Sequence, residues 1–207
     1  MEEKLEVIKE WLGTGSINIF GLPMSGKDTQ GIRLAEAIDG KFLSSGMIIR
    51  ALEKQERKNY SKTGELAPTN VFYEWVLPFF ERRDLFKYPL VLSSIGRWSG
   101  EEEQVMSVAA GAGHDIKAAV LLNISEADVT RRFEEAKILN DRGDRVDDKD
   151  LEVFKTRINE FKNKTIPVIQ HYKTMGLLVE VNGDQNRDEV FSELVEKIYQ
   201  KALQSRA

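Results

Sequence analysis

The sequence predicts an α/β fold of three layers (α/β/α), in which helices cover both faces of a parallel central sheet. Short, largely apolar runs at 90–92, 118–122 and 177–181 alternate with charged stretches of helical periodicity. Strands that are buried on both faces of a parallel sheet have this apolar character. The 207 residues, 41% of them hydrophobic, suffice for one full core, and we expect a single domain over residues 1–207.

The N-terminal part predicts a helix, a strand and a second helix. Residues 2–12 are expected to be helical because apolar side chains recur on one face: Leu5, Ile8, Trp11 and Leu12. Residues 17–20 form a short β-rich run that ends at Gly21. Helical spacing resumes between residues 32 and 38, so the first strand should lead through a loop into a helix.

Four longer stretches have helical periodicity: 71–87, 126–139, 150–175 and 187–204. Pro78 and Pro167 fall inside the first and the third of them, where a proline should kink or divide the helix. The most charged and least apolar stretch is 140–150, which predicts a mobile loop.

Composition excludes several kinds of function. The formal net charge is −4 and the two signs are mixed along the chain, so nucleic acid is not an expected partner. There is no cysteine, which excludes disulfides, thiolate metal sites and a cysteine nucleophile. The sequence has neither an apolar signal segment nor a run of membrane-spanning length, so we expect a soluble cytoplasmic protein with no membrane partner.

A phosphate-binding loop is predicted between the first strand and the helix that follows it, with the sequence Gly21-Leu22-Pro23-Met24-Ser25-Gly26-Lys27-Asp28-Thr29. Backbone N–H groups of a glycine-rich turn and of a helix N-terminus bind anions, and Lys27 adds a charge. The strict pattern has Ser or Thr directly after the lysine, whereas here Asp28 intervenes before Thr29. Asp28 would repel a polyphosphate, so we expect it to point away from the ligand.

The spacing Gly-x-Pro-x-Ser-Gly-Lys-x-Thr resembles that of adenylate kinases and their nucleoside monophosphate kinase relatives. The resemblance implies a P-loop NTPase fold with an acceptor-binding insertion at about 43–73 and a lid at about 132–146. It also implies that ATP and Mg²⁺ bind to the loop, at Gly21, Pro23, Met24, Ser25, Gly26, Lys27, Asp28 and Thr29. A nucleoside monophosphate would then accept the phosphoryl group, and Lys27 would be catalytic.

The segment Ser45-Gly46-Met47-Ile48-Ile49-Arg50 resembles the acceptor motif Thr-Gly-Asp-hydrophobic-hydrophobic-Arg of that family. The resemblance implies that Ser45 and Gly46 line the acceptor site and that Arg50 binds the acceptor phosphate with its planar fork of donors. Residues 64–68 resemble a stretch that lines the acceptor base, which places Leu66 there.

Residues 92–97, Leu-Ser-Ser-Ile-Gly-Arg, stand where the family has Leu-Asp-Gly-Phe-Pro-Arg. Arg97 is retained as an acceptor and catalytic residue, but the aspartate that organises Mg²⁺ and its waters is replaced by Ser93. We therefore expect Ser93 to reach the metal through water and to retain it less strongly. Glu101 replaces a glutamine that binds the acceptor base, and an ionised carboxylate suits guanine better than adenine.

The C-terminal half resembles the family's lid and the segment that follows it. Residues 145–148, Arg-Val-Asp-Asp, precede Arg157, which implies that Arg145 and Arg157 close on the transferring phosphoryl group. Arg132 would contact the donor nucleotide and contribute to catalysis, and the next lid arginine is replaced by Ala136. The short lid and the absence of cysteine imply the form without zinc.

These resemblances favour an ATP-dependent kinase that phosphorylates AMP and acts as a monomer. A kinase for GMP, a pyrimidine or a deoxynucleotide is the first alternative. A catalytically weak nucleotide-binding or regulatory protein is the second, because Asp28, Ser93 and Ala136 all fall at motif positions. A phosphotransferase for another small molecule shares the loop and remains the third.

Overall fold

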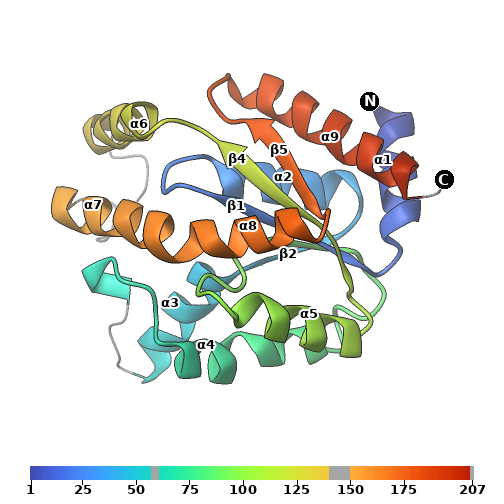
Figure 1. Cartoon of the computed structure of the whole chain (residues 1–207), viewed down its shortest axis with the longest axis horizontal. Coiled ribbons are helices and arrows are strands. Elements are labelled where there is room, and N and C mark those ends of the chain that lie inside the picture. Colours follow the sequence, from blue (N-terminus) through green and yellow to red (C-terminus); the bar gives the residue numbers. More distant parts are fainter. Residues whose placement is uncertain (57–60, 140–149, 206–207) are drawn as a thin grey trace.

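The computed structural model describes residues 1–56, 61–139 and 150–205, and within them it forms a parallel sheet of five strands in the order β2-β3-β1-β4-β5 (Figure 1). The strands are β1 (Ser16–Gly21), β2 (Lys41–Ser44), β3 (Leu90–Ser93), β4 (Ile116–Asn123) and β5 (Leu178–Asn182). All four pairings are parallel, with Ile17 opposite Val91 and Ala118 on its two neighbours. The predicted α/β/α fold is confirmed.

Helices cover both faces of this sheet. One face carries α1 (Glu2–Leu12), α2 (Lys27–Ala37) and α9 (Arg187–Gln204), whose apolar residues pack on those of β1, β4 and β5. The other face carries α3 (Ser45–Glu56), α4 (Thr69–Trp75), α5 (Glu101–Gly111), α6 (Glu126–Leu139), α7 (Leu151–Glu160) and α8 (Ile166–Thr174). In Figure 1, α1 and α9 lie above the sheet edge and α4 and α5 below it.

Alternation along the strands divides the core between the two faces. Val91 points into the cluster beneath α1, α2 and α9, while Leu90 and Leu92 point into the cluster on the opposite side. All three side chains are fully buried. A strand with apolar residues on both faces is therefore a continuous apolar run, which is why these strands are visible in the sequence.

Most predicted elements are confirmed, and one helix prediction needs correction at its end. The stretch 71–87 is divided as Pro78 predicts, because α4 ends at Trp75 and a 3₁₀ segment, η2 (Leu77–Glu81), follows with Pro78 in its first turn, but the helical structure does not reach residue 87. Arg82 is extended, so the helical path stops there. The stretch 150–175 is divided as Pro167 predicts, because a π-helical segment, η4 (Phe161–Thr165), separates α7 from α8.

Three elements were not predicted, namely strand β2 and helices α3 and α5, and a 3₁₀ turn, η1 (Ser61–Thr63), precedes α4. Residues 41–44 of β2 are Lys-Phe-Leu-Ser, a short edge strand with an exposed lysine and no long apolar run. The loop predicted at 140–150 lies outside the described residues except for its last residue, and so does the second half of the predicted lid, residues 140–146. Within the part of the chain that is described, no helix has both the length and the apolarity that a membrane crossing requires.

Asn18 is a polar residue at the centre of the sheet, and it is fully buried. Its Nδ2 donates to the carbonyl oxygen of Ile95 at 2.7 Å, and its Oδ1 accepts from the N–H of Ile95 at 3.2 Å. The N–H of Ser94 donates to the carbonyl oxygen of Ile19 at 3.0 Å. These bonds tie the segment after β3 to β1, so the path from Ser94 to Arg97 is set by β1.

We expect Asn18→Ala to lower the free energy of unfolding by about 2–4 kcal/mol, because both backbone groups of Ile95 lose their buried partner. Urea denaturation followed by circular dichroism measures this loss. The control is Asn123→Ala at the exposed end of β4, which should change stability by less than about 0.5 kcal/mol. Equal effects of the two variants would contradict the role given to Asn18.

Candidate functional site

The site lies at the carboxyl edge of the sheet, between the segments that follow the neighbouring strands β1 and β3. Helix α2 follows β1 on one face, while α5 follows β3 on the other. Parallel α/β sheets bind ligands at such a switch point, because the two connections leave the edge in opposite directions and a crevice opens between them.

The predicted phosphate loop joins β1 to α2, and its geometry leaves the helix N-terminus without a side-chain cap among the described residues. Gly26 precedes the helix with φ of 88°, which favours glycine. Lys27 Nζ lies 3.5 Å from the carbonyl oxygen of Leu22 and lines the cavity described below. The first N–H groups of α2 are therefore available to an anion held by the loop.

Two of the predicted loop residues have features that the sequence does not show. Met24 has φ of 66°, a left-handed conformation that is uncommon for residues other than glycine, and its side chain is buried in the core. Ser25 is buried with its Oγ beside Gly21, and this Oγ has no hydrogen-bond partner within the described residues. Strain and unsatisfied polar atoms of this kind cluster at ligand sites.

A cavity of about 120 Å³ opens beside this loop. Four cationic side chains from different parts of the chain line it: Lys27, Arg50, Arg97 and Arg157. Three acidic side chains also line it: Asp28, Glu65 and Glu101. Its other walls include Ser45, Gly46, Leu66, Ser93 and Pro23, so the cavity gathers most of the predicted acceptor residues and three of the loop residues.

Arg97 lies where the segments after β1 and β3 meet. Desolvation and, to a smaller extent, the nearby charge of Arg157 lower the pKa of Arg97 to about 10, although Glu160, Glu101 and Asp28 act in the opposite direction. Its buried Nε has no hydrogen-bond partner among the residues that the structure describes. A buried cation with an unsatisfied donor is suited to bind an anionic ligand, because a nearby negative charge stabilises the protonated guanidinium.

Arg50 and the acceptor loop face Arg97 across the cavity. The guanidinium of Arg50 folds back over Gly46, where a Cβ atom would lie 3.1 Å from Nη1. Ser45 Oγ donates to the carbonyl oxygen of Ser94 at 2.7 Å, which joins α3 to the segment after β3. The N–H of Leu66 donates to Glu160 Oε2 at 3.0 Å, so α7 holds the loop that carries Leu66.

Glu101 is 2% exposed, and its carboxylate already has partners in the backbone. Oε2 accepts from the N–H of Arg97 at 2.8 Å and from the N–H of Trp98 at 3.0 Å. Burial raises the pKa of Glu101, and these donors act against that rise. A base could use this oxygen only by displacing a backbone donor, so base recognition by Glu101 stays a prediction.

Trp98 is a cavity residue that the sequence analysis did not identify. Its Nε1 donates to the carbonyl oxygen of Ala67 at 3.2 Å, and Lys164 Nζ lies 3.8 Å from the ring centroid. Lys164 also pairs with Glu160 at 2.6 Å. Its position directly after Arg97 was the sequence feature that could have identified it. The indole ring gives the acceptor side of the cavity a flat apolar wall.

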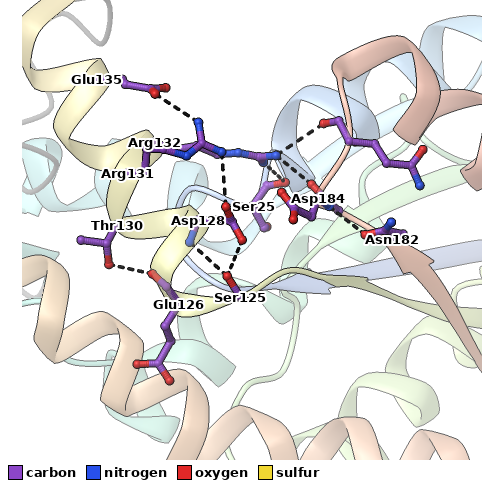
Figure 2. A network of polar contacts seen from close by, with 12 residues as sticks. Ser25, Ser125, Glu126, Asp128, Thr130, Arg131, Arg132, Glu135, Asn182 and Asp184 are labelled. Atoms are coloured by element: carbon purple, nitrogen blue, oxygen red, sulfur yellow. Dashed lines mark hydrogen bonds and ion pairs between the residues drawn. The ribbon is translucent and has the colours of Figure 1, made fainter.

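Arg132 lies on α6, and the cavity lining does not include it. Figure 2 shows its guanidinium between the phosphate loop and the turn after β5. Nη1 donates to the carbonyl oxygen of Ser25 at 3.4 Å, and Nη2 donates to that of Gly183 at 2.8 Å. Arg132 thus joins the backbone of the phosphate loop to the turn after β5, outside the lining of the cavity.

Asp28 was expected to point away from the ligand, and this expectation is wrong. Its side chain lines the cavity, and Ser93 Oγ donates to Asp28 Oδ1 at 2.5 Å. Thr29, the loop residue predicted to hold the metal, is exposed on the first turn of α2 and does not line the cavity. The inward orientation follows from the hydrogen bond to Ser93, because β3 ends directly opposite that turn.

The residues present fit a magnesium ion that arrives with a phosphate ligand. No group of three His, Asp or Glu side chains among the described residues forms a metal cage. Mg²⁺ usually keeps several waters and is held by one or two carboxylates together with substrate phosphates. Asp28, with Ser93 beside it, provides such a carboxylate. Arg145, Asp147 and Asp148 lie outside the described residues.

Known proteins with similar sequences are nucleotide kinases, although no family model matches the chain. An adenylate kinase from Micrococcus luteus is 27% identical over 187 residues, covering 87% of this chain and 89% of its own length. An adenylate kinase from Parvibaculum lavamentivorans is 29% identical, covering 85% and 88%. A UMP-CMP kinase from Lentinula edodes is 29% identical, covering 84% and 81%.

Among solved structures, a gluconokinase from Sinorhizobium meliloti 1021 has the same fold. The superposition has a TM-score of 0.61 at 18% identity and covers 93% of this chain and 95% of the other. At that identity the likeness establishes the fold alone.

We expect Gly21→Ala to destabilise the phosphate loop by about 1–3 kcal/mol, because the new Cβ would lie 2.5 Å from Ser25 Oγ. Thermal unfolding and ATP titration should both report the loss. Adding Ser25→Ala should recover part of it by removing the closest atom. Gly111→Ala on α5, where a Cβ meets nothing within 4 Å, is the control and should be neutral or stabilising.

We expect Arg97→Met to raise the stability of the ligand-free protein by about 1 kcal/mol, because a desolvated cation is removed. The folded-state pKa of Arg97 lies below its ordinary value, so the unfavourable contribution is complete below pH 10 and is relieved above it. Urea denaturation at pH 7.5 measures the change, with the exposed Arg83→Met as the control. Destabilisation by Arg97→Met alone would contradict this account of its charge.

Proposed function

This chain belongs to the adenylate kinase and nucleoside monophosphate kinase family, and from this premise we propose that it transfers the γ-phosphoryl group of ATP to a nucleoside monophosphate. It is an ATP-dependent phosphotransferase. The observation that carries the proposal is the meeting of Lys27 with Arg50, Arg97 and Arg157 around one cavity beside the phosphate loop. Phosphoryl transfer depends mainly on alignment of two charged substrates and on neutralisation of charge.

On the donor side, the triphosphate of ATP lies on the N–H groups at the start of α2. Lys27 neutralises the transferring group, and Arg132 approaches the nucleotide from α6. Mg²⁺, if bound with ATP, would neutralise part of the charge of the phosphates. Of this chain's own groups, Thr29 and Ser93 were predicted to hold the ion or its waters, and Asp28 lies on the same side.

On the acceptor side, Arg50 and Arg97 hold the monophosphate and point its oxygen at the phosphate loop. Trp98 and Leu66 provide the apolar wall against which a base can stack. Arg157 lies between the two sides, where its charge repels that of Arg97 in the ligand-free protein. The negative charges of two bound phosphates would relieve this repulsion. Binding of both substrates would therefore neutralise the positive charge of the site.

We assign the acceptor insertion to residues 43–73 and the lid to 132–146, with Arg145 closing over the phosphates. The segment of the acceptor insertion near Gly64 packs on α7, because a Cβ at Gly64 would lie 2.5 Å from the carbonyl oxygen of Val153. Movement of the lid would exclude water and contribute to the rate. The monomeric state and the cytoplasmic location stay predictions.

AMP is the proposed acceptor, since two of the relatives named above are adenylate kinases. The alternative is a pyrimidine monophosphate, which the UMP-CMP kinase relative supports, or GMP, because an ionised carboxylate at Glu101 suits guanine better than adenine. The nonenzymatic alternative rests on Asp28 and Ala136, which replace residues of the family's motifs.

The test is an ADP-release assay with ATP and Mg²⁺ across AMP, GMP, CMP, UMP and dTMP. We expect one monophosphate to be preferred, and we expect Lys27→Ala to lower kcat by about 10²–10³-fold, because one preorganised charge at the transferring group is lost. Lys197→Ala, a change of the same kind on the exposed face of α9, is the control.

Tight binding of ATP without transfer to any of the five monophosphates would favour the nonenzymatic alternative. Activity of Lys27→Ala equal to that of the unmodified protein would refute the proposed position of the donor phosphates.

A further inference from the structure

The contact between Asp28 and Ser93 joins the two halves of the site. Asp28 lies on the first turn of α2, one residue after Lys27, and Ser93 is the last residue of β3. Ser93 Oγ donates to Asp28 Oδ1 at 2.5 Å, and Ser93 is 1% exposed. The carboxylate of Asp28 is therefore oriented by a buried partner, and it lines the cavity together with Lys27.

The other two acidic side chains of the cavity are placed differently. Glu101 Oε2 accepts from the backbone N–H groups of Arg97 and Trp98. Glu65 belongs to the loop next to Leu66, on the acceptor side. Asp28 is thus the carboxylate that adjoins the phosphate loop within the described lining.

A carboxylate at this place has opposite effects on a bare and on a metal-bound polyphosphate. It repels a triphosphate bound to the N–H groups of α2, although the helix dipole itself favours a negative charge there by about 0.3–1 kcal/mol. A divalent cation between the two negative groups reverses the sign of that interaction, because the ion's charge dominates the local field. The orientation of Asp28 is therefore favourable for ATP only when a cation is bound with it.

Resting on the proposed function, we propose that Asp28 is the positioning carboxylate for the magnesium that accompanies ATP, and that Ser93 orients it. The resemblance assigns a metal-organising aspartate to position 93, where this chain has serine. The hydrogen bond places the carboxylate of Asp28 directly beside that position. In this chain the acidic group has moved from the end of β3 to the first turn of α2, and the pair Asp28–Ser93 performs the task of one aspartate.

The test measures the affinity for ATP by calorimetry, with Mg²⁺ and with EDTA, and takes the ratio of the two as the magnesium effect. We expect Asp28→Asn to reduce this ratio about tenfold, the usual scale for a group that orients a metal's ligands. Affinity for metal-free ATP should stay equal or rise, because the repulsion is removed. Glu36→Gln, a matched change on the exposed part of α2, should leave the ratio unaltered.

The double variant Asp28→Asn/Ser93→Asp returns an acidic group to the end of β3 and should restore most of the ratio. Ser93→Ala keeps the carboxylate but removes its buried donor, so an intermediate ratio is expected. This variant also carries the test if Asp28→Asn fails to fold.

An unchanged ratio in Asp28→Asn, with only a lower melting temperature, would overturn the inference and leave Asp28 a structural residue. Equal loss of both affinities would overturn it too, since Asp28 would then shape the loop. These outcomes differ from failure of the proposed function, in which the unmodified protein itself shows no ATP binding or no magnesium effect.

Discussion

The pairing of β1 with β3 is the constraint on which the rest of the site depends. Because the two strands run parallel and in register from Ser16 and Leu90, they end at the same edge of the sheet. Asn18 then holds the backbone of Ile95, so the segment that leads to Arg97 must turn over the end of β1. The phosphate loop and the acceptor arginine are neighbours for this reason, although more than sixty residues separate them in the sequence.

The second constraint is electrostatic. Four cationic side chains line one cavity, and burial together with the charge of Arg157 lowers the pKa of Arg97 in the ligand-free protein. Asp28 and Glu101 offset part of this shift. The site therefore stores an unfavourable interaction that two phosphates relieve, which explains why a binding surface of this kind is less stable without its ligands.

The parts that the sequence predicted correctly are those in which local chemistry and position agree. Continuous apolar runs marked β3 and β4, and the glycines and Lys27 marked the loop, because these features depend on few other residues. Strand β2 was not predicted, because the extended conformation of its four residues depends on their pairing with β3. The inward position of Asp28 could not be predicted because it depends on a hydrogen bond from Ser93, which is distant in sequence. The hydrogen bonds of Glu101 to the backbone could not be predicted because Trp98, one of the donors, belongs to no motif.

The central claim is that donor and acceptor phosphates meet in one continuous site. The most direct measurement is the affinity, by calorimetry with Mg²⁺, for a dinucleoside pentaphosphate that joins adenosine to the nucleoside of the preferred acceptor. Linking two bound groups raises the affinity by about 10²–10⁴-fold when both sites can be occupied at once. The account predicts a gain of that size over ATP. An affinity no greater than that of ATP would contradict it.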